Sequence, residues 1–533
     1  MCELEFDFAQ QSAINHGEGP ALVVAGPGSG KTAVITERLF RMTSSGIDPF
    51  SILAVTFSNA AVNEMKERYI RRGGKYGVTF CTFHSYLYGL IRRAGQAPGE
   101  NPGGSVSGKS KSWGADSDGF GEISFDEMLT RGLWLLKNDD KILAGQRKRF
   151  KHVLIDEFQD INRTQYEAVK LIAKPEDNIF AVGDDDQSVY GFRGADPAIM
   201  FEFAKEYKNI RIINLSTNYR SCAGIVTGAA ALISNNKNRF EKEVSLPDSQ
   251  PGGTQILRTG RRKTGFLSGD EKKEGIFVRS SVDIFTQAEA IAGEIKSIKR
   301  EEIPSFKTAV LLRNADLIEI FAYALEKNGI PFFAAGTAGS LFAGRTARRI
   351  VSQMRAAARI NSAGISVNDA GLGVAAGLPT AAAMEFFGLK DSGRLPGMEA
   401  GKSEQESEKN AYDFLYETAK CFPDKEEWLK FADHAAKKVR PEKETGAGSS
   451  VSVMTMHAAK GLEFDVVFLP AVNNEIIPGR RTECEEQLEE ERRIFYVALT
   501  RARKRAYIFV TERIGAKKSE ASVFLKEVLR EKG

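Results

Sequence analysis

Residues 25 to 32 read Ala25-Gly26-Pro27-Gly28-Ser29-Gly30-Lys31-Thr32, after the apolar run Ala21–Val24 and before apolar residues at helical spacing from Ala33 to Met42. A buried strand entering a glycine-rich turn that ends in Gly-Lys-Thr is typical of a phosphate-binding loop. Its backbone N–H groups can surround a triphosphate at the N-terminus of the following helix. Lys31 is placed to reach the β- and γ-phosphates, and the Thr32 hydroxyl to ligate Mg²⁺. The usual first glycine is Ala25, where a small residue still fits, so the stretch predicts a nucleotide site.

A second apolar run, Val153–Ile155, ends in the two carboxylates Asp156 and Glu157. In a nucleotide hydrolase with a phosphate loop, the aspartate there holds Mg²⁺ and the glutamate orients and deprotonates the attacking water. An Asp-Glu pair at a strand end is common on its own. The combination with the phosphate loop, and glutamate rather than an amide at position 157, predicts hydrolysis rather than binding alone.

Short apolar runs alternate with helical patterns through the first half of the chain, which predicts an α/β fold with parallel sheets. The runs are Ala21–Val24, Ile52–Thr56, Val78–Phe80, Val153–Ile155, Ile179–Val182 and Ile210–Leu215. In the second half we expect an amphipathic helix at Ser281–Lys299, a buried strand at Thr308–Leu312, a helix at Leu317–Asn328 and a resumed core from Val451. A chain of 533 residues exceeds one typical core, so several domains are expected.

The composition is that of an ordinary globular protein, with 42% hydrophobic and 27% charged residues. A net charge of only +4 means that any nucleic-acid groove must be local. Five cysteines without a C-x-x-C pair argue against zinc or an iron–sulfur cluster, and His457 has no ligand partner at metal-binding spacing. The polar N-terminus does not read as a signal peptide, and no apolar run reaches about 18 residues. We therefore expect a cytoplasmic protein without a membrane span.

Further segments resemble, in order, the motifs of the UvrD/Rep group of superfamily 1A DNA helicases. They are Phe8–Ile14 (Q motif), Thr56–Ala61 with Glu64–Lys66 (Ia), Thr82–Ser85 (Ib), Asp156–Asp160 (II), Val182–Ala195 (III), Asn218–Ser221 (IV), Met454–Phe464 (V) and Glu490–Ala502 (VI). The set spans nearly the whole chain. An ordered series of this kind is far more specific than a phosphate loop alone.

The resemblance implies two RecA-like P-loop NTPase domains with parallel sheets, each carrying a small, mainly helical insertion. The first domain is expected at 1–92 and 146–217, with a short 1B-like insertion at 93–145. The second is expected at 218–357 and 448–533, with a reduced 2B-like insertion at 358–447. Gly95–Gly121 has a linker composition, which predicts a mobile loop, and Gly371–Ala383 is rich in alanine and glycine.

The resemblance also assigns roles around ATP beyond those of the loop, Lys31, Thr32, Asp156 and Glu157. Gln10 reads the adenine edge, Tyr219 stacks on adenine and Glu463 binds the ribose. Gln187 contacts the γ-phosphate. Arg220 and Arg501 point at the γ-phosphate across the cleft between the domains, where a guanidinium stabilises the charge of the leaving phosphoryl group. Composition alone would make Arg501 a surface arginine, since it lies among several basic residues.

For DNA, the resemblance implies contacts from Phe57, Asn59, His84, Tyr190, Phe192 and Arg193. Aromatic rings and an arginine beside the bases would hold single strands with little sequence preference. Core packing is the alternative for the phenylalanines. The family usually has tryptophan at position 192 and lysine at position 60, where this chain has phenylalanine and alanine.

The first hypothesis is an ATP-dependent DNA helicase or single-strand translocase, moving 3′ to 5′, in DNA repair, replication or recombination. Its substrates would be single-stranded DNA and single-strand/duplex junctions, with repair or nuclease proteins as partners. A motor subunit of an AddA-like or RecB-like helicase–nuclease and a non-hydrolysing DNA-binding scaffold are the alternatives. The reduced 2B-like insertion predicts a better translocase than unwinding machine.

Overall fold

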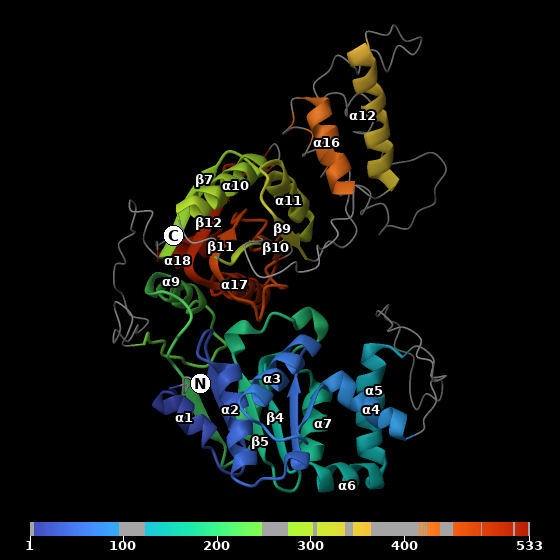
Figure 1. The fold of residues 1–533 in the computed structure, drawn as a ribbon, viewed down its shortest axis with the longest axis vertical. Coiled ribbons are helices and arrows are strands. Elements are labelled where there is room, and N and C mark those ends of the chain that lie inside the picture. The colour runs from blue at the N-terminus through green and yellow to red at the C-terminus, as the bar shows by residue number, and fades with distance from the viewer. Residues whose placement is uncertain are drawn as a thin grey trace. The chain divides into compact units, whose positions relative to one another are not determined.

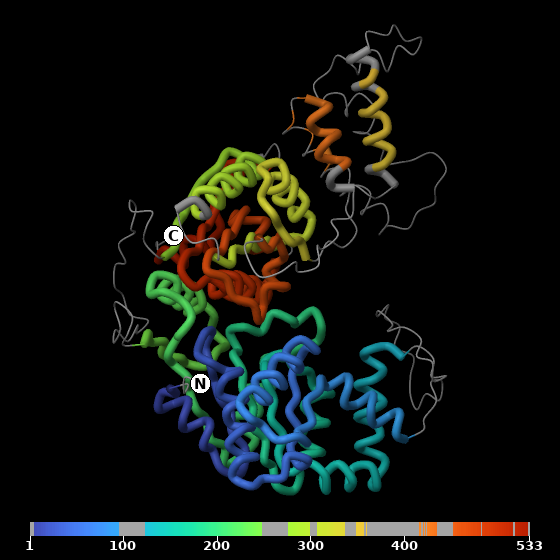
Figure 2. The backbone as a smooth tube through the Cα atoms, in the orientation of Figure 1, coloured from blue at the N-terminus to red at the C-terminus, as the bar shows by residue number. Residues whose placement is uncertain are grey.

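The computed structural model describes residues 5–94, 123–247, 275–301, 306–335, 345–363, 415–416, 419, 422, 424–436, 451–480, 482–514 and 517–530. Contacts divide the chain into two compact units (Figures 1 and 2). Unit 1 is Met1–Val226 with Asn236–Arg261, and unit 2 is Thr227–Asn235 with Arg262–Gly533. Each unit is described by itself.

Unit 1 is built on a parallel six-stranded sheet in the order β3-β2-β4-β5-β1-β6. The strands are β1 (Ala21–Ala25), β2 (Ile52–Thr56), β3 (Thr79–Thr82), β4 (His152–Ile155), β5 (Ile179–Gly183) and β6 (Arg211–Leu215). All six lie where the apolar runs predicted strands. Because the strands are parallel, the segments that follow β1, β2, β4 and β5 meet at one edge of the sheet.

Helices cover both faces of this sheet (Figure 1). They are α1 (Phe8–Ile14), α2 (Lys31–Ser44), α3 (Asn59–Arg71), α4 (Phe83–Arg93), α5 (Phe125–Asn138), α6 (Asp140–Arg149), α7 (Arg163–Ala173) and α8 (Ala198–Glu206), with 3₁₀ turns at Pro49–Ser51, Phe158–Asp160, Asp185–Gln187 and Gly191–Arg193. Alternate residues of β1 face opposite cores, as the pleat requires. Val23 packs with α2 and α3, whereas Val24 packs with α4, α5, α7 and α8.

Helix α5, predicted as part of a 1B-like insertion, shares the core of unit 1. Its Leu129 and Leu136 belong to the same buried cluster as β1 and β4, and Gly132 packs directly on Leu87 of α4. The predicted loop at Gly95–Gly121 lies outside the described residues. Unit 1 also extends past the predicted domain end at 217, to Val226, and includes Asn236–Arg261. Motif IV therefore lies in unit 1, and the assignment of 93–145 as a separate insertion stays a prediction.

Unit 2 contains a second parallel six-stranded sheet, in the order β7-β12-β11-β8-β10-β9. Its strands are β7 (Gly275–Ser281), β8 (Thr308–Leu312), β9 (Phe332–Ala334), β10 (Val451–Thr455), β11 (Phe464–Leu469) and β12 (Ala502–Thr511), beside a small hairpin of β13 (Arg513–Ile514) and β14 (Lys517–Lys518). The helices are α9 (Ala223–Ile233), which contains the boundary between the units, α10 (Ile284–Glu301), α11 (Ile318–Lys327), α12 (Arg345–Ala363), α16 (Lys425–Ala436), α17 (Glu485–Leu499) and α18 (Val523–Leu529), with a 3₁₀ turn at Ala315–Leu317. Strand β7 was not predicted, and the helix expected from Ser281 begins at Ile284.

The described part of the predicted 2B-like insertion contributes α16 to the core of unit 2. Trp428 and Phe431 of α16 are buried in the same cluster as α10 and α11, and Phe431 lies 5.2 Å from the ring of Tyr323. Helix α12 packs along α16. The stretch Gly371–Ala383 lies outside the described residues. Among the helices that the structure describes, none is long and apolar enough to cross a membrane.

Candidate nucleotide-binding site

The phosphate-binding loop joins β1 to α2 and is held in a left-handed conformation at two glycines, Gly28 (φ +73°) and Gly30 (φ +84°). The Ser29 hydroxyl donates to the Gly26 carbonyl at 2.8 Å. Asn218 Nδ2 donates to the Pro27 carbonyl at 2.9 Å, and the Tyr219 N–H donates to the Gly28 carbonyl at 2.9 Å. Motif IV, about 190 residues further along the chain, thus fixes the loop within unit 1.

Helix α2 begins at Lys31, and none of the described side chains caps its N-terminus. By contrast, Ser58 caps α3 and Thr82 caps α4. An uncapped N-terminus offers its first N–H groups and the helix dipole to an anion. Lys31 Nζ donates to the Ala25 carbonyl at 3.2 Å and lies 4.0 Å from Asp184 Oδ2, so its charge lies at the mouth of the loop.

The Q-motif residues lie against the same loop. Gln10 Nε2 donates to the Ser29 carbonyl at 3.0 Å, while Asp7 Oδ1 caps α1 by accepting from the Gln10 N–H at 2.7 Å. The second oxygen of Asp7 accepts from the Tyr219 hydroxyl at 2.7 Å. Partial burial together with this bond raises the pKa of Tyr219 to about 12. The two predicted adenine-side residues, Gln10 and Tyr219, therefore both bind Asp7. Tyr219 remains 44% exposed.

Asp7 is a residue that we did not predict from the sequence. The available signal was a capping box, with Asp7 before the helix and Gln10 three residues later. That pattern indicates a helix start, and it does not show that the free carboxylate oxygen binds a tyrosine more than 200 residues away.

The carboxylates of motif II lie at the end of β4. Asp156 is buried, and burial together with the neighbouring charge of Glu157 raises the pKa of Asp156 to about 7. Glu157 adopts φ +54°, a left-handed conformation that is strained for a residue with a Cβ. With the half-buried Thr32 hydroxyl at the start of α2, Asp156 offers hard oxygen ligands of the kind that Mg²⁺ prefers. A divalent cation there would compensate the buried charge, so the residues fit the predicted metal.

Gln159, a second residue missed from the sequence, connects motifs II and III. Its side chain is fully buried. Oε1 accepts from the Asp184 N–H at 2.9 Å, and Nε2 donates to the Glu157 carboxylate. The predicted base is therefore oriented through the main chain that follows β5.

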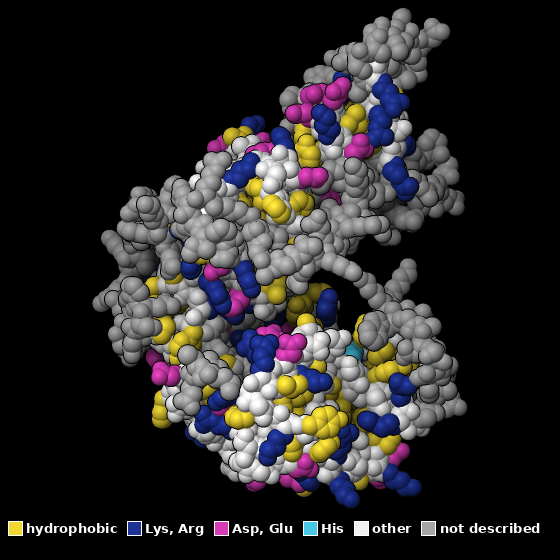
Figure 3. Space-filling view, in the orientation of Figure 1, with side chains coloured by type: hydrophobic (Ala, Val, Ile, Leu, Met, Phe, Trp, Pro, Cys, Tyr) yellow, Lys and Arg dark blue, Asp and Glu magenta, His cyan; other side chains and the backbone are white. Residues whose placement is uncertain are grey.

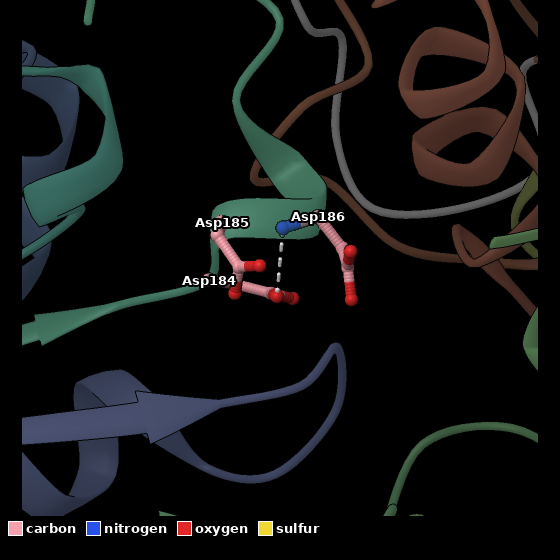
Figure 4. Close-up of side chains that lie close together, drawn as sticks. All are labelled: Asp184, Asp185 and Asp186. Atoms are coloured by element: carbon pink, nitrogen blue, oxygen red, sulfur yellow. Dashed lines mark hydrogen bonds between the residues drawn. The ribbon is translucent and has the colours of Figure 1, made fainter. Parts of the chain in front are cut away.

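Motif III forms a 3₁₀ turn at Asp185–Gln187, capped by Asp184. Gln187 is buried, and its Nε2 donates to Asp184 Oδ2 at 2.5 Å. Figure 4 shows the three consecutive carboxyl groups gathered at this turn, with the Asp186 N–H directed at Asp184 at 3.3 Å.

The predicted DNA contacts include a cluster of aromatic rings on unit 1. Phe57 and Tyr190 stack at 4.9 Å with 11° between their planes, and Phe192 lies 6.0 Å from Tyr190. The Arg193 guanidinium lies 5.4 Å from the ring centroid of Tyr190 and 5.5 Å from that of Phe192. Because 66% of Phe192 is exposed, core packing does not explain this residue.

His84 and Asn59 are the other two predicted DNA contacts. His84 makes an edge contact with Phe125, at 5.1 Å between centroids, and burial lowers its pKa. It lines a small hollow together with Phe57, Asp156 and Glu157. Asn59 is the exposed first residue of α3. On the face shown in Figure 3, lysine and arginine side chains are scattered over unit 1.

The remaining predicted ATP-site residues are Arg220 and, in unit 2, Glu463 and Arg501. Arg220 is half-buried beside the phosphate loop. Arg501 is 2% exposed, and its Nε donates to the Val497 carbonyl at 2.9 Å while Nη1 donates to the Leu462 carbonyl at 3.2 Å. The surface position that composition favoured for Arg501 is therefore wrong. Glu463, the residue after Leu462, forms an ion pair with Arg503.

Comparisons with known proteins agree with these motifs. A family model described as the UvrD/REP helicase N-terminal domain matches residues 6–113 and 109–208, and one described as the UvrD-like helicase C-terminal domain matches residues 213–364 and 398–513. The chain is 28% identical to a probable DNA helicase II homolog of Rickettsia conorii and 29% identical to DNA helicase II of Rickettsia typhi, with 94% of this chain and 91% of each relative covered. It is 28% identical to the ATP-dependent DNA helicase PcrA of Bacillus subtilis, with 94% and 82% covered. These alignments run over 610, 622 and 613 positions, more than the 533 residues of this chain, so the relatives contain segments that it lacks.

Proposed function

Because the chain belongs to the UvrD/REP helicase family, we propose that it is a DNA-dependent ATPase that moves 3′ to 5′ along single-stranded DNA and works as a DNA helicase. The observation that best supports this function is the connected site of unit 1. Hydrogen bonds join the phosphate loop to Gln10 and Tyr219, and join the candidate base Glu157 to motif III.

ATP would bind with its phosphates at the uncapped N-terminus of α2 and its base between Gln10 and the exposed ring of Tyr219. Lys31 would leave its loop carbonyls to meet the β- and γ-phosphates. Thr32 and Asp156 would hold Mg²⁺, which neutralises charge on the phosphate oxygens. Glu157, oriented by Gln159, would take a proton from the attacking water.

For the other ATP-site residues we retain the roles that the motifs imply. Gln187 would sense the γ-phosphate, because its amide is held at the same turn that lies beside Lys31. Arg220 and Arg501 would stabilise charge on the leaving phosphoryl group. Glu463 would bind the ribose.

Single-stranded DNA would stack on Phe57, Tyr190 and Phe192, with Arg193 near the phosphates or bases. The main chain gives a route from this cluster to the ATP site, since Tyr190 follows Gln187 by three residues in motif III. Stacking is tolerant of sequence, and phosphate contacts release counterions. DNA binding should therefore be independent of sequence and sensitive to salt.

The substrates would be single strands and single-strand/duplex junctions, in DNA repair, replication or recombination in the cytoplasm. This chain lacks segments that its relatives contain, and separating a duplex needs a surface beyond the motor core. We therefore expect this chain to track along single strands better than it unwinds long duplexes unaided. A repair or nuclease partner would then supply that surface, as in AddA-like or RecB-like assemblies.

The test is ATP hydrolysis by the purified chain with and without single-stranded DNA. We expect DNA to stimulate turnover, and the Glu157→Gln variant to bind a fluorescent ATP analogue normally while losing about 10²–10⁴-fold in turnover. Phe192→Ala is the matched control for the DNA side, since it should weaken stimulation by DNA and leave the basal rate unchanged. Normal turnover in Glu157→Gln would overturn the base assignment. ATP binding without any hydrolysis by the wild type would instead indicate a DNA-binding scaffold.

A further inference from the structure

Lys242, in the part of unit 1 that follows α9, lies among the three consecutive carboxylates of motif III. Its Nζ is 2.5 Å from Asp184 Oδ1, 2.5 Å from Asp185 Oδ1 and 2.8 Å from Asp186 Oδ2. The lysine side chain is 6% exposed and the carboxylates are at most 1% exposed. These are ion pairs removed from water, unlike the many surface pairs of this chain.

Two neighbours of Lys242 bind the same turn. The Arg239 guanidinium makes a two-pronged contact with Asp186, at 3.0 Å from Nε and 2.7 Å from Nη2. The Phe240 N–H donates to Asp185 Oδ2 at 2.9 Å, and its ring stacks at 4.5 Å on Phe201 of α8. The segment 239–242 therefore holds the carboxylates of Asp184, Asp185 and Asp186 like a clamp.

The turn depends on these cations because buried carboxylates are costly without a partner. Removing one member of a buried ion pair leaves the other charge buried without compensation, which strongly destabilises the fold. Although burial acts to raise the pKa of Asp186, Lys242 and Arg239 hold it below its usual value. Three carboxylates this close could also suggest a metal site. Figure 4 shows the three carboxyl groups. Because the ammonium group of Lys242 lies within 2.8 Å of an oxygen of each, the cluster is an ion-pair network.

The clamped turn is connected to three groups that the proposed hydrolysis uses: Gln187, Lys31 and, through Gln159, Glu157. Asp184 binds Lys242 through one oxygen and Gln187 through the other. That second oxygen also lies 4.0 Å from Lys31 Nζ. The main-chain N–H of Asp184 fixes Gln159, which in turn holds Glu157.

We propose that Lys242 and Arg239 are positioning residues for ATP hydrolysis, which hold the Asp184–Asp186 turn so that Gln187 and Glu157 keep their catalytic orientation. The inference rests on the proposed function, because the groups that the clamp orients act in ATP hydrolysis. It assigns no contact with ATP to Lys242 or Arg239. Losing the clamp would allow the turn to shift, and the groups that it orients act after the nucleotide has bound. The chemical step should suffer more than binding.

The experiment compares Lys242→Met, Lys242→Arg and the control Lys237→Met with the wild type. Methionine keeps the length of the side chain and removes its charge, whereas arginine restores the charge. Lys237 is an exposed lysine five residues earlier. For each protein one measures kcat and KM of DNA-stimulated ATP hydrolysis, the Kd of a fluorescent ATP analogue, and thermal unfolding.

We expect kcat of Lys242→Met to fall at least tenfold with Kd changed less than threefold, kcat of Lys242→Arg to recover in part, and Lys237→Met to match the wild type. A folded Lys242→Met protein with normal kcat would overturn the proposal and leave the proposed function standing. A loss of kcat equal to the unfolded fraction would also overturn it. A wild type that binds but does not hydrolyse ATP would overturn both.

If Lys242→Met does not fold, two further proteins take its place. The double variant Lys242→Met/Asp185→Asn removes one charge of each sign from the cluster. Arg239→Gln removes the two-pronged contact at a side chain that is 16% exposed. The same split between kcat and Kd is expected for both, and normal kcat in both would refute the positioning role.

Discussion

The phosphate loop offers a direct test of how tightly motif IV is packed against it. A Cβ added at Gly28 would lie 2.7 Å from Arg220 Cβ and 2.8 Å from Asn218 Oδ1, and the residue would sit at φ +73°. A Cβ at Gly26, two residues earlier in the same loop, would meet nothing within 4 Å. Gly28→Ala and Gly26→Ala therefore make the same chemical change with opposite steric outcomes.

The magnitude follows from two costs. A left-handed conformation costs an alanine about 1–2 kcal/mol more than a glycine. Contacts of 2.7 and 2.8 Å must also be relieved, which adds about 1–3 kcal/mol for overpacking. Asn218 cannot simply turn away, because its side chain donates to the Pro27 carbonyl and accepts from the Arg220 and Ser221 N–H groups. The free energy of unfolding should fall by about 2–5 kcal/mol, combining both costs.

The assay is thermal unfolding followed by circular dichroism, on the nucleotide-free protein. For a folding unit of about 150–250 residues, the expected loss lowers the midpoint by roughly 4–20 °C. Gly26→Ala should stay close to the wild type. Equal midpoints for the two variants would refute the reasoning, because they would show that the loop does not pack on Asn218 and Arg220.

Two further predictions concern the body of unit 1. Gly132→Ala should lower the unfolding midpoint, because its Cβ would lie 2.6 Å from Leu87 Cβ. The control is Gly145→Ala on α6, whose Cβ would meet no atom within 4 Å and whose free energy of unfolding should rise by up to about 1 kcal/mol from helix propensity. Equal effects of the two alanines would contradict the packing of α5 on α4. Arg72 and Arg41 lower the pKa of Glu37 even though burial acts to raise it, so the stability that Glu37 contributes is present above pH 4.5 and is lost as the pH falls through its lower folded pKa. The stability difference between wild type and Glu37→Gln, measured by denaturant unfolding from pH 7 to pH 4, should therefore be about 1–3 kcal/mol at neutral pH and shrink with acid; a difference that grows toward pH 4 would show the opposite sign.

The strands and the phosphate loop were predictable because their signals are local. A run such as Ile52–Thr56 is buried on both faces of a parallel sheet, so unbroken hydrophobicity marks it in any context. The left-handed turns of the loop can be inferred from glycines at fixed spacing. The missed strand β7, Gly275–Ser281, has three polar residues among its seven, Arg279, Ser280 and Ser281, and so it lacks that continuous apolar pattern.

The partners of the site residues could not be predicted in the same way. Asp7, Gln159 and Lys242 carry ordinary local signals, those of a helix cap, a polar residue after a strand and a lysine in a charged segment. Their roles depend on which distant backbone or side chain the fold brings within 3 Å. The burial of Arg501 could not be predicted from local composition either. Its basic neighbours in the sequence suggested solvent exposure, whereas the structure buries it against carbonyl groups.

Buried amide side chains connect the motifs of unit 1, and their chemistry explains why amides rather than acids serve there. Gln10 accepts from the Asp7 N–H and donates to the Ser29 carbonyl. Gln159 accepts from the Asp184 N–H and donates to the Glu157 carboxylate, and Asn218 accepts from two N–H groups and donates to the Pro27 carbonyl. Each link needs a donor and an acceptor on one side chain, which an ionised carboxylate cannot provide. These hydrogen bonds connect each motif to the next, so under the proposed function we expect a shift of one motif to reach its neighbour through an oriented side chain.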